Sequence, residues 1–373
     1  MVREVSVWDV HSGAVLARPI ISAAGSILLS EGQKLTEQQI KKLRKLNIKT
    51  VYVRTEVTEQ AAHAKEAALP EWTFPAGERT ASAQTIEQKK VAQAVTEFLD
   101  SPRVKGLIAI SYMEETFRRY ARQMFQTIVS RPFLLEQLTT LYRTDLFLFN
   151  HSLNVAVTSG IVGLALKYDY DQLLELTIGA MLFDIGMSQL PEHLVKSTDT
   201  LTDWQRAELA SHPILGYQIL ISQQEVPKAA ALCALQHHER FDGTGYPYRL
   251  KKAQIHPYAQ IVAISDVYNA LISPRHYRNA YSHQEAIEFL YAAGNKYFDL
   301  SLIKTFLKHI CVYPESCKVL LSNGKIGVVA AKNIDTPHRP VVKVIREADG
   351  TPIDPPYEID LKKHVDVVIV QVL

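Results

Sequence analysis

The chain has no long hydrophobic run and no excess of charge of either sign. Its formal net charge is +2 over 373 residues, and its Lys and Arg residues form no extended basic block. We therefore expect no duplex nucleic acid as a partner. No stretch approaches the roughly 18 consecutive apolar residues that cross a bilayer, and no secretory segment opens the sequence. We expect a cytoplasmic protein with no membrane partner.

Cysteine is also scarce. Cys233, Cys311 and Cys317 have no paired metal-ligand spacing, and an odd count is typical of a reducing compartment. We expect structural thiols. A chain of 373 residues exceeds the roughly 250–300 residues that one core usually supports, which predicts two or three domains.

Hydrophobic periodicity divides the sequence into four parts. Residues 1–55 hold short apolar runs around one amphipathic stretch, which predicts a small α+β module. Residues 56–83 have no sustained period and predict a linker. The helical period of residues 84–310 predicts an all-α domain. In residues 311–373, short segments that are apolar or alternate between apolar and polar residues are separated by turn residues, which predicts a small β module. The predicted fold is therefore mainly α.

Capping chemistry supports the helical domain. Thr202 with Gln205, and Ser282 with Glu285, have the spacing of a capping box. We expect His151 to begin the helix that continues to Leu164.

Histidines and acidic residues in this domain fall at predicted helix ends or on apolar faces. They are His151, Asp184, His212, His237, His238 and Asp266. Such ligands suit a divalent ion such as Mn, Fe, Ni or Zn, and a bridging carboxylate allows two ions to share a site. For any one histidine, a satisfied hydrogen bond in the core is favoured by roughly two to one. Asp266 fits a core role least, because a carboxylate in an apolar run is costly unless a cation pairs with it.

The order of these motifs resembles that of the HD-GYP family of metal-dependent phosphohydrolases, across about residues 130–310. The matching segments are His151-Ser152, Leu182 to Met187, His212-Pro213, His237 to Pro247, and Asp266 to Tyr268. The resemblance implies an HD-type helical domain that opens cyclic di-GMP, with Asp184 as the catalytic, bridging carboxylate. It implies a first metal subsite of Asp184, His212, His237 and His238, and a second of His151, Asp184, Asp266 and one more histidine.

Three positions depart from the family pattern. Phe183 stands where the family has the histidine of its His-Asp pair, and Met187 stands where it has a lysine. Phe147 replaces a glutamate that supports a third metal in some members, so no trinuclear centre is expected. We expect one ion to be well held and the second to be weakly held.

The Gly245-Tyr246-Pro247 loop is intact. A D-G-x-G sequence after a helix is often only a turn. The resemblance places this loop beside the substrate, with Tyr246 on a guanine and Arg240 or Arg278 on phosphate.

Two functions remain open from the sequence. The first is a cyclic di-GMP phosphodiesterase with an impaired or altered metal centre. The second is an inactive module that binds cyclic di-GMP or a related nucleotide, or docks a diguanylate cyclase. Hydrolysis of a different phosphate ester is a third option, and a homodimer remains open.

Overall fold

The computed structural model describes residues 85–373 apart from 102–103, 105–106, 110, 198–199, 275–279 and 334–335. It also describes residues 2–54 apart from 8–9, 11, 18–19, 22–26, 30–31 and 46–49. The chain forms two compact units, Met1–Glu78 and Arg79–Leu373. The linker expected at residues 56–83 lies outside the described residues.

The N-terminal unit combines one helix with short antiparallel strands. A three-stranded sheet has the order β1-β5-β2, and β3 pairs with β4. The elements are β1 Val2–Ser6, β2 Val15–Leu16, β3 Ile20–Ile21, β4 Ile27–Leu29, α1 Glu37–Lys45 and β5 Thr50–Arg54. Leu16, Leu35, Leu43 and Val51 are buried together and form its small core. The described residues of this unit thus combine a helix with strands, as expected of an α+β module.

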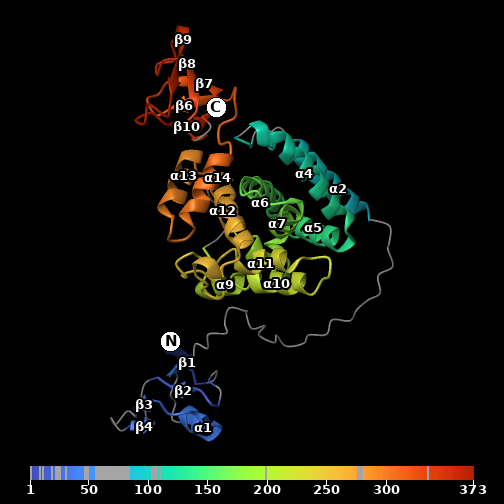
Figure 1. The fold of residues 1–373 in the computed structure, drawn as a ribbon, viewed down its shortest axis with the longest axis vertical. Helices are drawn as coiled ribbons and strands as arrows, with labels where there is room; N and C mark the ends of the chain where they lie inside the picture. Colours follow the sequence, from blue (N-terminus) through green and yellow to red (C-terminus); the bar gives the residue numbers. More distant parts are fainter. Residues whose placement is uncertain are drawn as a thin grey trace. The chain divides into compact units, whose positions relative to one another are not determined.

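The larger unit is mainly helical (Figure 1). Its helices are α2 Ile86–Asp100, α4 Ser111–Ser130, α5 Pro132–Thr144, α6 Leu146–Ala165, α7 Tyr170–Leu182, η1 Ile185–Gln189, α8 Glu192–Val195, α9 Asp203–Leu209, α10 His212–Ile221, α11 Lys228–Gln236, η2 Lys252–Gln254, α12 Pro257–Ile272, α13 His283–Ala292 and α14 Leu300–His309. The capping boxes at Thr202 and Ser282 both form.

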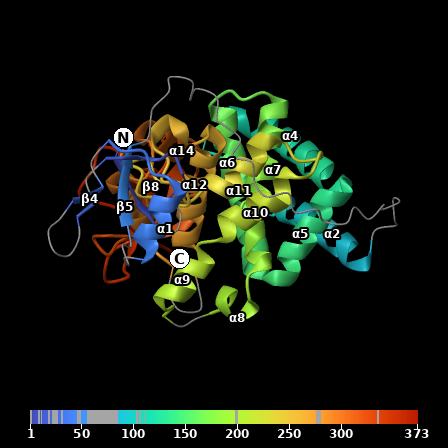
Figure 2. The ribbon, with the colours of Figure 1, turned by 90° about the horizontal axis from the view of Figure 1, so that it is seen from below.

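Helix α6 is the central helix of this unit. It packs between α7 and α12, and α11 lies beside α7 and α10 (Figures 1 and 2). By length and composition α6 could cross a membrane, but 83% of its apolar window is buried inside the protein. Burial on all sides explains why its sequence is apolar around the whole helix instead of on one face.

The start of α6 corrects one expectation from the sequence. The Asp145 carboxylate accepts the backbone N–H of Phe147 at 2.6 Å, so α6 begins at Leu146. His151 therefore lies in the second turn of the helix and not at its beginning. Its side chain is buried among the helices, with 5% exposure, because the extra turn carries it away from the helix end.

The C-terminal residues form a five-stranded antiparallel sheet in the order β10-β6-β7-β8-β9. The strands are β6 Lys318–Leu321, β7 Ile326–Ala331, β8 Val341–Arg346, β9 Pro352–Asp360 and β10 Ile369–Val372. Two bonds reach the segment between α2 and α4: Lys332 Nζ, directly after β7, donates to Ile108 O at 3.3 Å, and the N–H of Cys311, between α14 and β6, donates to Leu107 O at 2.6 Å. Of the apolar stretch at residues 365–370, only the part from Ile369 onward lies in a strand.

Candidate metal centre

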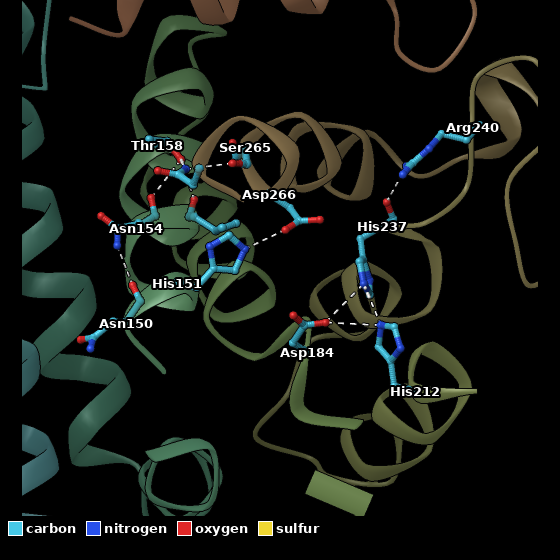
Figure 3. A network of polar contacts seen from close by, with 12 residues as sticks. Asn150, His151, Asn154, Thr158, Asp184, His212, His237, Arg240, Ser265 and Asp266 are labelled. Atoms are coloured by element: carbon cyan, nitrogen blue, oxygen red, sulfur yellow. Dashed lines mark hydrogen bonds and ion pairs between the residues drawn. The ribbon is translucent and has the colours of Figure 1, made fainter. Parts of the chain in front are cut away.

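Asp184, His212 and His237 meet at the junction of three helices (Figure 3). Asp184 follows the end of α7, His212 begins α10, and His237 caps the end of α11. Asp184 Oδ1 lies 3.4 Å from His212 Nε2 and 3.5 Å from His237 Nε2. The two Nε2 atoms are 3.2 Å apart. Three segments far apart in the sequence thus converge on one point.

Backbone carbonyls orient both imidazoles. His212 Nδ1 lies 2.7 Å from Leu209 O, and His237 Nδ1 lies 3.1 Å from Cys233 O and 3.0 Å from Ala234 O. Since a carbonyl only accepts, each Nδ1 carries a proton, and Nε2 is the ring nitrogen that either donates to the Asp184 carboxylate when protonated or offers a lone pair to a cation when the imidazole is neutral. A carbonyl behind the second ring nitrogen is the usual support of a metal-bound histidine.

His238 completes a set of donors. Its ligand atom and those of His212 and His237 all lie within 4.8 Å of one another. Together with the Asp184 carboxylate they form three nitrogens and one oxygen. The three imidazoles could hold a metal ion, and the Asp184 carboxylate lies 3.4 and 3.5 Å from two of them. The residues therefore fit a borderline divalent ion.

The charges in this cluster depend on one another. Burial pushes the pKa of Asp184 upward, but the hydrogen bonds with His212 and His237 outweigh it and hold that pKa well below its usual value. Burial would lower the pKa of His212, yet the Asp184 carboxylate raises it. For His238, burial and the neighbouring imidazoles both lower the pKa. The site keeps its carboxylate ionised, which favours a bound cation.

In the second predicted subsite, His151 has a carboxylate on one side and phenylalanine rings on the other. His151 Nε2 lies 2.7 Å from Asp266 Oδ1, while His151 Nδ1 is buried with no hydrogen-bond partner among the described residues. The fully buried Phe183 ring lies 6.0 Å from that of His151 and 4.9 Å from that of His237. Phe147 stacks on His151 at 5.9 Å. An apolar ring therefore stands where a further imidazole ligand was expected.

A polar network aligns α6 with α12, and the sequence analysis missed it. Asn269 Nδ2 donates to Thr158 Oγ1 at 3.0 Å and to Ser265 O at 2.8 Å. Thr158 Oγ1 in turn donates to Asn154 O at 2.9 Å (Figure 3). The network fixes the register of the two helices and so places His151 opposite Asp266. Polar residues four apart on otherwise apolar helices were the available signal.

The Gly-Tyr-Pro loop packs directly on the histidines. The Tyr246 ring stacks on His238, with centroids 4.7 Å apart and planes 21° apart, and Pro247 follows, half-buried. Arg240 Nη1 donates to the carbonyls of His237 and Glu239 at 3.2 Å, and its guanidinium lies 5.3 Å from the Phe298 ring centre. Arg278 lies outside the described residues.

Two family descriptions match the chain. Residues 122–302 match the HD domain family, and residues 318–373 match the KOW domain associated with HD domain. The cyclic di-GMP phosphodiesterase PA4108 of Pseudomonas aeruginosa is 28% identical over 94% of this chain and 84% of its own length. The cyclic di-GMP phosphodiesterase response regulator RpfG of Xanthomonas campestris is 29% identical over 60% of this chain and 64% of its own length.

A solved structure of an HDG"Y"P protein from Bdellovibrio bacteriovorus aligns with 82% of this chain and 98% of its own, at 18% identity and a TM-score of 0.40. The order of the histidine motifs in the sequence, the cluster around Asp184 and the sequence matches all indicate the same family. Residues 122–302 thus match an HD domain, and the chain is similar to cyclic di-GMP phosphodiesterases of the HD-GYP family.

Proposed function

We propose that this protein is a cyclic di-GMP phosphodiesterase that holds one divalent ion tightly. The observation that carries the proposal is the convergence of Asp184 with His212 and His237, beside His238 and an intact Gly-Tyr-Pro loop. These four side chains would hold the ion, which when bound supplies positive charge to activate water and to stabilise a leaving oxygen. Asp184 is the residue on which both predicted subsites depend.

Binding of the nucleotide is assigned to the loop side of the site. Gly245, Tyr246 and Pro247 form the wall beside His238, where a guanine base would lie. Arg240 or Arg278 would meet phosphate. Relatives named for cyclic di-GMP and for 3'3'-cGAMP both support a cyclic dinucleotide as the substrate class.

The second subsite is proposed to be weak. His151, Asp184 and Asp266 remain as donors, but Phe183 is an apolar neighbour with no lone pair. Met187, half-buried three residues after Asp184, adds no cation for a phosphate. Since two-metal hydrolysis uses both ions, a weak second ion slows the reaction by orders of magnitude. The tight ion is one of Mn, Fe, Ni or Zn.

The alternative is a module that binds the nucleotide without turnover, and Phe183 and Met187 are the observations that favour it. Such a module would sense cyclic di-GMP or dock a diguanylate cyclase through the Gly-Tyr-Pro loop. In either case we propose a cytoplasmic protein, with the helical domain at 84–310 between modules at 1–55 and 311–373 and a linker at 56–83. A homodimer is compatible with both functions.

The two functions are separated by one experiment. Purified protein loaded with Mn, Fe or Ni is incubated at high concentration with cyclic di-GMP, and the linear product is measured by chromatography. We expect slow, metal-dependent product formation that Asp184→Asn abolishes. Nucleotide binding without product would replace the enzyme by the binding module. Activity on other nucleotides alone would assign a different phosphate ester.

A further inference from the structure

Glu239, directly after the two histidines, is buried but is not part of the ligand cluster. It has 2% exposure, and its two carboxylate oxygens accept different backbone N–H groups. Oε1 accepts from Tyr248 at 2.7 Å and Oε2 accepts from Leu250 at 2.9 Å. Both donors belong to the segment that follows Gly-Tyr-Pro. The end of α11 therefore holds the loop through a side chain as well as through the backbone.

The first half of the loop packs tightly against the backbone of residues 238–240. The N–H of Tyr246 donates to His238 O at 3.2 Å. A Cβ atom on Gly245 would lie 2.3 Å from Arg240 N and 2.5 Å from both Glu239 Cα and His238 O. Because these contacts are to backbone and not to flexible side chains, only glycine allows this approach.

The two ends of the loop are fixed elsewhere. Phe241 N donates to Tyr297 O at 3.0 Å, and the N–H of His256 donates to Gln236 Oε1 at 2.7 Å. These bonds hold the base of the loop but not the part that covers His238. The Glu239 carboxylate anchors Tyr248 and Leu250, directly after that part, and bonds to a charged acceptor are stronger than neutral ones.

The covering part of the loop contacts a metal-ligand candidate. With its plane 21° from that of His238, the Tyr246 ring shields one face of the imidazole and limits its rotation. His238 also differs from His212 and His237, whose Nδ1 atoms face backbone carbonyls. Among the described residues, no backbone carbonyl accepts a hydrogen bond from the His238 ring. The stacked tyrosine takes the place of that support.

We propose that Glu239 is a positioning residue for the metal centre: its carboxylate holds the loop so that Tyr246 keeps His238 in the orientation that binds the ion. The affinity for metal thus depends on a carboxylate that is not a ligand. This inference rests on the proposed function only in assuming that the histidine cluster binds a divalent ion.

The test is Glu239→Gln. The amide still accepts one N–H but directs its own NH2 group at the other, so the anchor is lost with little change in volume. We expect hydrogen exchange at the Tyr248 and Leu250 amides to accelerate, and the dissociation constant for Mn to rise about tenfold, as for other residues that support ligands. The matched control is Glu288→Gln on the exposed face of α13, where both quantities should stay at the wild-type values.

A second variant separates stacking from anchoring and covers the case in which Glu239→Gln does not fold. Tyr246→Leu removes the ring and leaves Glu239 in place, so the Mn dissociation constant should rise while exchange at Tyr248 and Leu250 stays slow. Unchanged Mn affinity in Tyr246→Leu, or unchanged amide exchange in a folded Glu239→Gln, would overturn the inference. A wild type that binds no Mn refutes the proposed metal site instead, and the exchange data still decide whether the anchor exists.

Discussion

The rings of Phe183 and His237 are nearly perpendicular, at 80°, with their centroids 4.9 Å apart. Phe183 and Asp184 are consecutive, so one short segment after α7 places an apolar ring and a carboxylate beside the same histidine. The carboxylate belongs to the half of the site that can hold an ion. The ring lies beside His151, in the half that is proposed to hold its ion weakly. Because Phe183 supplies no ligand atom, we expect slow hydrolysis even though the other family motifs are present.

The two carboxylates of the site should differ in their effect on metal binding. We expect Asp184→Asn to weaken binding of the tight ion by roughly tenfold or more, since losing even a supporting partner of a ligand costs about 10–100-fold. Asp266→Asn is the matched control and should retain that ion, because Asp266 contacts His151 and not the His212–His237 pair. Metal titration of both variants checks this. Equal losses would show that Asp266 serves the same ion.

Metal binding should weaken in mild acid. The Asp184 carboxylate raises the pKa of His212 above its usual value, which for histidine is about 6.5. A proton on Nε2 excludes the ion, so affinity should fall as the pH is lowered through this raised pKa, starting above about pH 6.5. The dissociation constant for Mn measured between about pH 5.5 and 8 reports the effect. A constant that does not change down to about pH 6 would be inconsistent with this coupling.

Gly186 should be far less tolerant of substitution than Gly160. A Cβ on Gly186 would lie 2.0 Å from His212 O and 2.6 Å from Gly216 N, both backbone atoms, whereas one on Gly160 would meet only the Phe117 ring, at 3.3 Å or more. We expect Gly186→Ala to lower the free energy of unfolding by about 2–3 kcal/mol or more and Gly160→Ala by about 1 kcal/mol or less. Thermal or urea unfolding compares the two. Similar losses would contradict the close packing of η1 on α10.

Much of the helical architecture follows from local sequence. The capping boxes at Thr202 and Ser282 form as their spacing predicts, because a cap depends only on residues three apart. The start of α6 was placed too late because the capping Asp145 was overlooked. Strand β9, Pro352–Asp360, could not be predicted locally because its prolines argue against a strand, although an edge strand tolerates them.

The sequence names the residues of the candidate site but does not give their arrangement. The motif order singles out the histidines and Asp184, and the structure brings Asp184, His212 and His237 together, whereas their role as metal ligands stays a prediction. The contact between His151 and Asp266 depends on the alignment of α6 with α12, which Asn269 and Thr158 fix across 111 residues of sequence. The stacking of Tyr246 on His238 likewise depends on how the loop folds back. Such long-range contacts leave no periodic pattern in a single sequence.

The central claim is that Phe183 leaves the protein with one tightly held ion. Elemental analysis of the native protein beside its Phe183→His variant, with activity on cyclic di-GMP measured for both, tests it directly. We predict about one metal or fewer per chain in the wild type, and a second metal with faster hydrolysis in the variant. Two tightly bound metals in the wild type would contradict the account.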